Sequence, residues 1–328
     1  MGITLGERMG NMTSEERRDW INRTIIAGMR DADRKVKLLY RAPLSAGLSS
    51  EGSTSKTTEL ITRELLDTLT ASEDLLISFK YNWSHGHTAD KLFIVHGGKL
   101  TDTYWNPLPD NYKVLWTVRN EDFFILRWGQ PDFVRSFIQN NKKEYVTGCI
   151  LGSECYIPAN DYISIDYKGK NQNYAFERQW LFYLIWGRLL YHPEMNDSVF
   201  IHEIESKFNI RHGEEFLRAF KLASNFYHRF GSFYKGTWDA TAYAEAFIGF
   251  DKVTAKHITL DMLIRNKVLD TINYMDIEEF IKTDRNLKTN SKITPLQLAD
   301  TCEKEADELM KMADLFFTEY PENQPIFN

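Results

Sequence analysis

The sequence predicts an α/β protein built from stacked βα units around a parallel sheet, followed by a mostly α-helical region. Short apolar runs alternate with helical patterns through the first 190 residues, which is typical of such units. From Asp197 to the end, the apolar periodicity is helical throughout. The two patterns meet near His192-Pro193, so we expect one domain over residues 1–193 and a helical domain over residues 194–328.

Five short apolar runs mark the expected strands of the first domain. The first run is followed by Thr13-Ser14-Glu15-Glu16, a capping-box pattern that begins a helix. Further helices are expected over residues 56–69 and 173–191. The first helix is expected to carry Trp20, Thr24, Ile25 and Met29 on one stripe. The expected strands are residues 2–6, 36–40, 75–81, 114–118 and 145–151.

The C-terminal region reads as a series of helices with breaks at residues 209–213, 231–236 and 289–293. Its last segment, residues 294–319, has apolar residues at helical spacing with charges between them, which predicts an amphipathic helix packed on its neighbours. The apolar stripe of this helix is Leu296, Leu298, Cys302, Ala306, Leu309 and Met312.

Composition indicates which partners to expect. With 46 acidic against 40 basic residues, the chain lacks the basic footprint of a nucleic-acid-binding protein. Aromatic residues make up 14% of the chain, more than a core of this size needs. Sugar-binding clefts use such rings, because the apolar face of a pyranose stacks on an indole. We therefore expect at least one of Trp83, Trp105 and Trp128 to line a cleft, while most other rings serve packing.

Cysteine usage and the hydropathy pattern exclude further classes. Three cysteines cannot form a disulfide framework, and no Cys/His cluster has the spacing of a zinc site. The first residues form no leader peptide, and no apolar run approaches the roughly 18 residues of a membrane span. The expected compartment is periplasmic or extracellular if an upstream segment is missing, and cytoplasmic otherwise. A carbohydrate is the expected partner, and a homo-oligomer is left open.

Polar side chains follow the predicted strands. In barrels and open α/β sheets alike, chemistry takes place beyond the carboxyl ends of the strands, where loops converge. The carboxylates at these positions, taken as candidate catalytic groups, are Glu7, Glu121, Asp122 and Glu154. The candidate substrate-binding residues are Arg41, Asn82, Trp83, His85, His87, Arg119, Asn120 and Tyr156.

Carboxylates that meet with Trp, His, Asn and Arg at one rim are suited to cleaving glycosidic bonds. One carboxyl group protonates the leaving oxygen, and another acts as nucleophile or activates water. Simpler interpretations stay open: Glu7 as a solvated acid, Glu121 or Asp122 as a helix cap, and His85 with His87 as a turn. A metal role for these histidines lacks an evident third ligand. No nucleophile elbow, phosphate-binding loop or dinucleotide fingerprint occurs.

Three stretches resemble the catalytic region of the α-glucuronidase-type glycoside hydrolases, families 67 and 115, or a related family. They are residues 2–7 (GITLGE), 116–127 (WTVRNEDFFILR) and 175–193 (AFERQWLFYLIWGRLLYHP). The resemblance spans roughly residues 1–230 and implies a (β/α)8 barrel followed by a helical domain. The implied activity is on plant or algal polysaccharide, including uronic-acid-containing chains, without a metal or organic cofactor. The resemblance places the general acid at Glu7, and the base or nucleophile at Glu121, Asp122 or Glu154.

Only five βα units precede the helical region, whereas a closed barrel needs about eight. We therefore expect a partial barrel, and favour missing upstream strands over an open sheet or a partner that closes the barrel. Two other hypotheses remain. One is a non-catalytic carbohydrate-binding or scaffolding protein with an incomplete barrel. The other is a helical interaction module, which predicts an exposed apolar stripe on residues 197–328.

Overall fold

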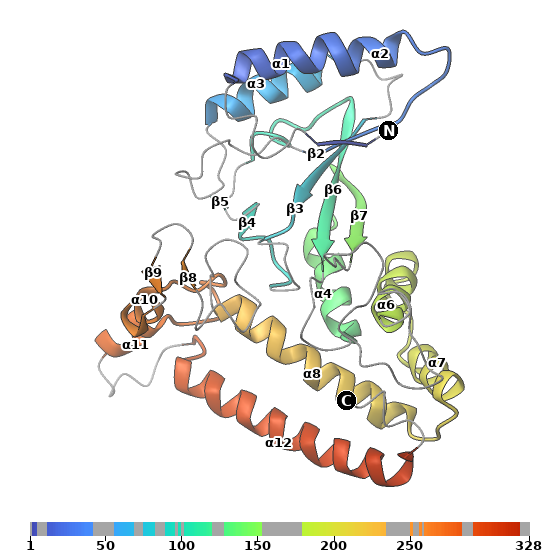
Figure 1. The fold of residues 1–328 in the computed structure, drawn as a ribbon, viewed down its shortest axis with the longest axis vertical. Coiled ribbons are helices and arrows are strands. Elements are labelled where there is room, and N and C mark those ends of the chain that lie inside the picture. The colour runs from blue at the N-terminus through green and yellow to red at the C-terminus, as the bar shows by residue number, and fades with distance from the viewer. Residues whose placement is uncertain are drawn as a thin grey trace. The chain divides into compact units, whose positions relative to one another are not determined.

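In the computed structural model the chain forms two compact units (Figure 1). The sheet unit comprises residues 1–84, 92–118 and 141–151, and the helical unit comprises residues 85–91, 119–140 and 152–328. The residues that the structure describes are 2–4, 12–41, 56–68, 75–82, 89–95, 98–99, 102–119, 128–152, 179–233, 250–251, 256–257, 259–283 and 291–321.

A five-stranded sheet forms the centre of the sheet unit, with strand order β1-β2-β3-β6-β7. The registers from β1 to β6 are all parallel, as in the pairs Ile3 with Tyr40, Tyr40 with Ile77, and Ile77 with Val114. This arrangement confirms the α/β class and the parallel sheet. The strands are β1 (Gly2–Thr4), β2 (Leu38–Arg41), β3 (Leu75–Lys80), β6 (Tyr112–Arg119) and β7 (Val146–Gly152).

One face of this sheet is apolar and aromatic. Because side chains alternate along a strand, Ile77 and Phe79 of β3 share this face with Val114 and Trp116 of β6, and all four are almost fully buried. Phe79 makes ring contacts with Tyr104, Trp105 and Trp116, at centroid distances of 4.8, 5.5 and 6.2 Å. The core of the sheet unit therefore lies on this side of the sheet.

Helix α3 (Lys56–Asp67) packs on the same apolar face. The guanidinium of its Arg63 lies 5.4 Å from the centre of the Tyr112 ring of β6. Asn111 Nδ2 donates a hydrogen bond to the carbonyl of Leu66 at 2.5 Å. A short antiparallel pair, β4 (Ile94–Val95) and β5 (Gly98–Lys99), also belongs to this unit.

The first helical segment consists of α1 (Ser14–Ile21), the π-helical turn η1 (Asn22–Ile26) and α2 (Ala27–Arg30). The predicted capping box is confirmed: Glu16 N–H donates to Thr13 Oγ1, and Thr13 N–H donates to Glu16. The predicted stripe is right in its second half, where Met29 is buried and Ile25 is half-buried, and wrong at Trp20, which is 37% exposed, and at Thr24, which is exposed. Ile21 and Ile26 are buried as well, because residues five positions apart share a face across a π turn.

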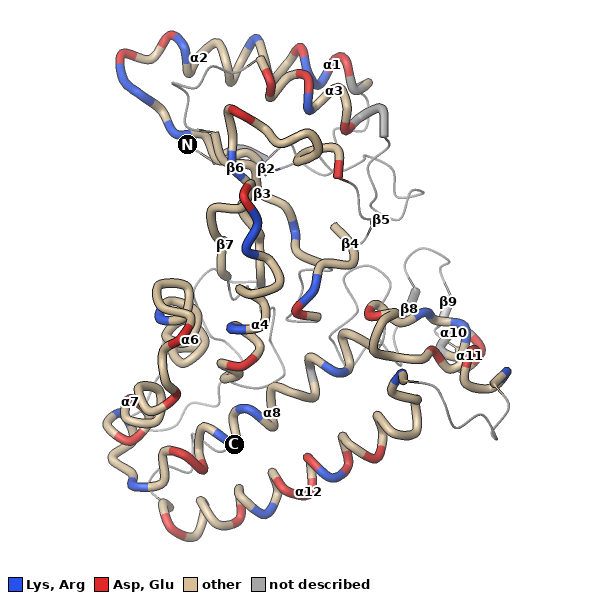
Figure 2. Tube along the Cα trace, turned by 180° about the vertical axis from the view of Figure 1, so that it is seen from behind, with Lys and Arg blue, Asp and Glu red and all other residues tan. Residues whose placement is uncertain are grey.

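The helical unit is built around α8 (Gly213–Phe233), which packs against α7 (Ser198–Phe208) and α12 (Pro295–Glu319). Lys, Arg, Asp and Glu are interspersed along α8 and α12 (Figure 2). The other elements are α4 (Pro131–Asn141), α6 (Trp180–Tyr191), β8 (Phe250–Asp251), β9 (Lys256–His257), α10 (Leu260–Arg265) and α11 (Ile277–Lys282).

Helix α12 matches its predicted span, and Thr294 and Gln297 form a capping box at its start. Leu298 is buried and Phe316 stacks on Phe216 of α8 at 3.9 Å. The predicted stripe is wrong at Leu296, which is 62% exposed, and at Ala306, which is exposed too. Leu296 lies in the first turn, where the helix begins. In the described part of the chain, no helix is both long and apolar enough to cross a membrane.

A second aromatic core fills the helical unit between α4, α6 and α8. Trp186 of α6 is fully buried and contacts Phe137 of α4 at 5.2 Å and Trp128 at 6.4 Å. Trp128 also meets His228 of α8 at 5.7 Å. The backbone at Gly129 passes close to this core, since an added Cβ there would lie 2.7 Å from Leu181 and 2.8 Å from Phe220.

We therefore expect Gly129→Ala to lower the free energy of unfolding by about 1–2 kcal/mol. The Cβ of Phe220 is attached to the helix backbone, so it cannot move aside as the end of a flexible side chain can. Gly187→Ala is the matched control, since nothing lies within 4 Å of its added Cβ and its helical position is exposed. That control should stabilise the protein by about 0.5–1 kcal/mol. Urea titrations of both variants provide the measurement, and equal effects would contradict the close approach at Gly129.

Candidate functional site

The second face of the parallel sheet becomes polar toward the carboxyl ends of its strands. The register pairs Arg41 of β2 with Ser78 of β3, and Lys80 of β3 with Thr117 of β6. Paired residues in neighbouring strands point to the same side of a sheet. These four residues, called here the polar face, thus lie on the side opposite Ile77 and Phe79.

Toward the amino ends of the strands, the same side of the sheet pairs Leu39 with Leu76 and Leu76 with Lys113. Lys113 is exposed, whereas Ser78 and Lys80 are buried. The buried polar residues of this side therefore lie in its carboxyl half. In α/β folds, this half is where substrates bind and react.

Two of the four residues of the polar face are buried, and Arg41 and Thr117 are half-buried. Ser78 is 4% exposed and Lys80 is 8% exposed. Ser78 Oγ and Thr117 Oγ1 are 3.0 Å apart and share a hydrogen bond. A lysine this deeply enclosed is rare and carries a desolvation cost, which pairing or hydrogen bonding of the charge offsets.

Asn82, a predicted substrate ligand, has a role in the fold. It is fully buried just beyond β3, and its backbone adopts the left-handed conformation with φ 48°. Its Oδ1 accepts hydrogen bonds from the backbone N–H of Phe93 at 2.8 Å and of Ile94 at 3.3 Å. These bonds tie the end of β3 to β4, so the Oδ1 atom is already engaged. A contact between Asn82 and a substrate stays a prediction.

Two further predicted residues end strands. Arg41 is the last residue of β2 and is half-buried, and Arg119 is the last residue of β6. The strand ends at Thr4, Arg119 and Gly152 directly precede the segments that contain the candidate carboxylates. The predicted residues that lie outside the described part of the chain are Glu7, Trp83, His85, His87, Asn120, Glu121, Asp122, Glu154 and Tyr156.

Sequence reasoning missed Ser78, Lys80 and Thr117, because it considered only the residues that follow each strand. The signal was present in the third strand, where Leu-Leu-Ile-Ser-Phe-Lys alternates polar and apolar residues in its second half. A period of two within a buried strand indicates that one face turns polar.

Of the three tryptophans expected near a sugar cleft, two serve packing. Trp105 contacts Phe79 and Trp116 and stacks on Tyr145 at 5.2 Å, which places its ring on the apolar side of the sheet. Trp128 is 3% exposed in the core of the helical unit. The third tryptophan, Trp83, lies outside the described residues, so its place in a sugar cleft stays a prediction.

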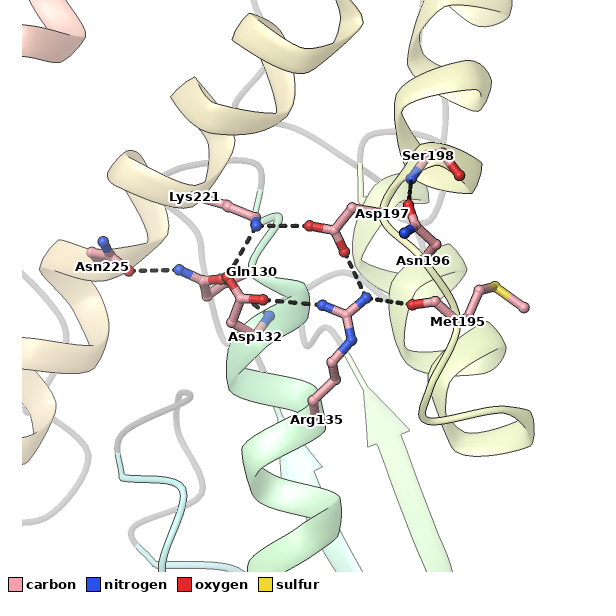
Figure 3. Close-up of polar contacts among 9 residues, drawn as sticks. All are labelled: Gln130, Asp132, Arg135, Met195, Asn196, Asp197, Ser198, Lys221 and Asn225. Atoms are coloured by element: carbon pink, nitrogen blue, oxygen red, sulfur yellow. Dashed lines mark hydrogen bonds and ion pairs between the residues drawn. The ribbon is translucent and has the colours of Figure 1, made fainter.

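A separate cluster of charges in the helical unit is internally paired (Figure 3). Arg135 of α4 contacts Asp132 at 3.0 Å and Asp197 at 2.6 Å. Lys221 of α8 contacts the same two carboxylates at 2.9 and 2.8 Å. Each cation thus has two anions and each anion two cations, and this charge ring links α4, the start of α7, and α8.

The pKa values in the charge ring reflect this pairing. Burial alone would raise the pKa of Asp197, but hydrogen bonds from Lys221 and Arg135 outweigh it, and the pKa lies below its ordinary value. Burial alone would lower the pKa of Lys221, but its hydrogen bonds to Asp197 and Asp132 raise it. Both shifts favour the charged forms, so the ring stabilises the fold and offers no group poised for proton transfer. No cluster of three or more potential metal ligands occurs among the described residues.

The fold and the polar face together define an α/β protein whose parallel sheet concentrates polar groups at the strand ends. The chain is similar to the solved structure of a GH138 enzyme targeting pectin rhamnogalacturonan II, with a TM-score of 0.66 and 15% identity. The similarity covers 99% of this chain and 37% of that one. At this identity the match shows a likeness of fold alone, and it does not point specifically to families 67 and 115. No protein-family model and no curated protein matches the sequence.

Proposed function

We propose that this protein is a glycoside hydrolase that acts on a plant or algal polysaccharide. The observation that carries the proposal is the polar carboxyl half of the sheet, within a fold that is similar to a pectin-targeting glycoside hydrolase over 99% of the chain. The chain spans little more than a third of that enzyme, and we propose that its five strands form part of a (β/α)8-type barrel.

The proposed acid and base are the carboxylates that follow the observed strands. Glu7 comes three residues after β1, Glu121 and Asp122 come shortly after β6, and Glu154 comes two residues after β7. Parallel strands direct the segments that follow them to one edge of the sheet. A pair from this set would donate a proton to the leaving oxygen and stabilise or attack the anomeric carbon.

The substrate proposed for this site contains uronic acid. Lys80 and Arg41 bring two cationic side chains to the polar face, and Ser78 and Thr117 add hydroxyl groups. Cations bind a sugar carboxylate by charge-assisted hydrogen bonds, and hydroxyls suit the ring hydroxyls of the same sugar. This charge pattern favours an α-glucuronidase-like or related activity over action on neutral sugars.

The function is tested by incubating the protein with pectic and glucuronoxylan oligosaccharides and following sugar release by chromatography and NMR. Release of a terminal uronic acid is the expected result. Binding of these oligosaccharides without any release, measured by calorimetry, would replace the hydrolase by the carbohydrate-binding alternative. If the oligosaccharides are neither cleaved nor bound, the hydrolase and the carbohydrate-binding hypotheses are both rejected.

Lys80→Met should raise KM for uronic-acid-containing oligosaccharides by about tenfold, since a hydrogen bond to a charged group typically contributes about 1.5–3 kcal/mol. Release from neutral oligosaccharides should change little. Lys113→Met is the matched control, because Lys113 pairs with Leu76 on the same side of the sheet but is exposed in its amino half. Equal losses on neutral and acidic substrates would show that Lys80 serves the fold and not the carboxylate.

A further inference from the structure

Two tyrosines lie in the core of the sheet unit, on its apolar face. The register pairs Tyr40 of β2 with Ile77 of β3, and the ring of Tyr104 contacts that of Phe79 of β3. Tyr40 is 2% exposed and Tyr104 is 1% exposed. A buried phenol group usually finds a hydrogen-bond partner, so each of these hydroxyls needs one.

The protein supplies no such partner to either hydroxyl. In the described part of the chain, the Oη atoms of Tyr40 and Tyr104 are enclosed and take part in no hydrogen bond. Tyr112 of β6, by contrast, donates its hydroxyl proton to the backbone carbonyl of Tyr104. A buried hydroxyl without a hydrogen bond costs free energy, so the two phenol groups call for an explanation.

The two hydroxyls lie close to each other and to two polar side chains of α3. Burial raises the pKa of Tyr104 most, Tyr40 and Glu59 raise it further, and Thr62 lowers it. Thr62 and Tyr104 are therefore neighbours, but their hydroxyl groups do not meet in normal hydrogen-bond geometry. Glu59 and Thr62 lie three positions apart on α3 and are 3% and 7% exposed. We call Tyr40, Glu59, Thr62 and Tyr104 the α3 cluster.

The charges around the α3 cluster favour a neutral ligand. Glu59 brings a carboxylate to the side of Tyr104. Burial raises the pKa of Tyr40, and the positive charge of Arg17 in α1 lowers it. Helices α1 and α3 pack side by side, so both charges border the same cluster (Figure 1). An anion would be repelled by Glu59, and a cation by Arg17.

We propose that the α3 cluster binds one water molecule, which joins β2 and the segment around Tyr104 to α3. A water molecule can accept two hydrogen bonds and donate two, and a buried one typically makes about three. This water accepts the protons of Tyr40 and Tyr104 and donates to Glu59 and Thr62. A carboxylate has about four acceptor sites and a hydroxyl two, so both can take a further bond beside those they already make. The inference does not depend on the proposed function.

A water site and a dry cluster predict opposite effects when a hydroxyl is removed. In a dry cluster the hydroxyls stay unbonded, so removing one relieves a buried polar group and stabilises the fold. At a water site the same change breaks a hydrogen bond and destabilises the fold. The sign of the change in stability therefore distinguishes the two.

Tyr40→Phe and Tyr104→Phe each remove one hydroxyl and keep the ring. Each should raise the equilibrium constant for unfolding roughly three- to tenfold in urea titrations. The double variant should be no less stable than the less stable single variant, because both changes act on the same water. Tyr191→Phe is the matched control: Tyr191 is 91% exposed, so its constant should stay within about twofold of the wild type. A lower constant in either single variant, or effects that multiply in the double variant, would overturn the shared water.

A crystal structure of the full chain shows the water directly. In the wild type, density for one oxygen atom should lie about 2.5–3.0 Å from both Tyr40 Oη and Tyr104 Oη. Density near neither phenol oxygen, or near one of them only, would overturn the bridge, and so would density larger than a single oxygen atom. If the phenylalanine variants do not fold, the wild-type density still decides the proposal.

Discussion

Glu121→Gln should abolish uronic acid release, with a loss of at least about a hundredfold in kcat, while the thermal midpoint stays nearly unchanged. A positioned acid or base typically increases the reaction rate by about 10²- to 10⁴-fold. The amide of glutamine can neither donate nor accept the proton that is transferred. Glu7→Gln should have an effect of the same size, because a glycosidase needs both carboxyl groups. The same oligosaccharide assay measures both variants.

Glu144→Gln is the control for these variants. Glu144 is an exposed carboxylate that precedes β7, at the opposite end of that strand from Glu154. Its loss should leave release unchanged, because chemistry belongs to the carboxyl ends of the strands. Full activity in both Glu7→Gln and Glu121→Gln would reject this assignment of acid and base. Loss of activity with a lower thermal midpoint would indicate a structural role instead.

The parallel sheet followed from local sequence patterns, and so did most helix ends. A run such as residues 75–81 is apolar, short and bounded by polar residues, and these features depend only on neighbours along the chain. The capping boxes at Thr13 and Thr294 are equally local, since each needs two residues three positions apart. Such features survive in the structure because tertiary packing does not oppose them.

The polar face and the first helix show where local patterns stop being sufficient. Which side of the sheet Lys80 shares with Arg41 depends on the register between β2, β3 and β6, which no single strand encodes. The π turn at residues 22–26 brings Ile21 and Ile26, five positions apart, to one buried face, a spacing that a fixed period of 3.6 residues does not predict.

The hydrogen bonds from Gln130 to Asn225 and from Asn225 to Glu305, like the charge ring, lie further beyond sequence reasoning. Gln130 and Asn225 are separated by 95 positions, and Asn225 and Glu305 by 80. Each residue alone looks like an ordinary polar residue on a helix or just before one. Only the packing of α4, α8 and α12 brings their donors and acceptors together, so the sequence offers no pattern that would single them out.

The largest stability effect is expected at the centre of the charge ring. Asp197→Ala should lower the free energy of unfolding by about 2–3 kcal/mol at pH 7, because it leaves Arg135 and Lys221 with Asp132 as their shared anion. The side chain of Asp132 is 63% exposed, so its attraction is screened by water. The Asp197 side chain makes no capping bond to α7, so the loss reports the ring and not a helix end.

The effect of Asp197→Ala should depend on pH in a defined direction. The pKa of Asp197 is lowered in the fold, so its contribution is complete above its ordinary value of 3.8 and is lost as the pH falls through the folded value. The pKa of Lys221 is raised, so its contribution is complete below its ordinary value of 10.5 and is lost as the pH rises through the folded value. Between these two pH limits, the difference in the free energy of unfolding between variant and wild type should not change with pH.

Urea titrations between about pH 2 and pH 8 measure this difference in the free energy of unfolding directly. The range includes the ordinary pKa of a carboxyl group. Asp261→Ala is the matched control, because Asp261 pairs with Arg265 at 3.1 Å but both side chains are about two-thirds or more exposed, at 67% and 72%. That variant should change stability little at any pH, since exposed pairs contribute almost nothing. If the Asp197→Ala deficit were as small as the control, or persisted undiminished at pH 2, ionic pairing would not be what holds α4, α7 and α8 together.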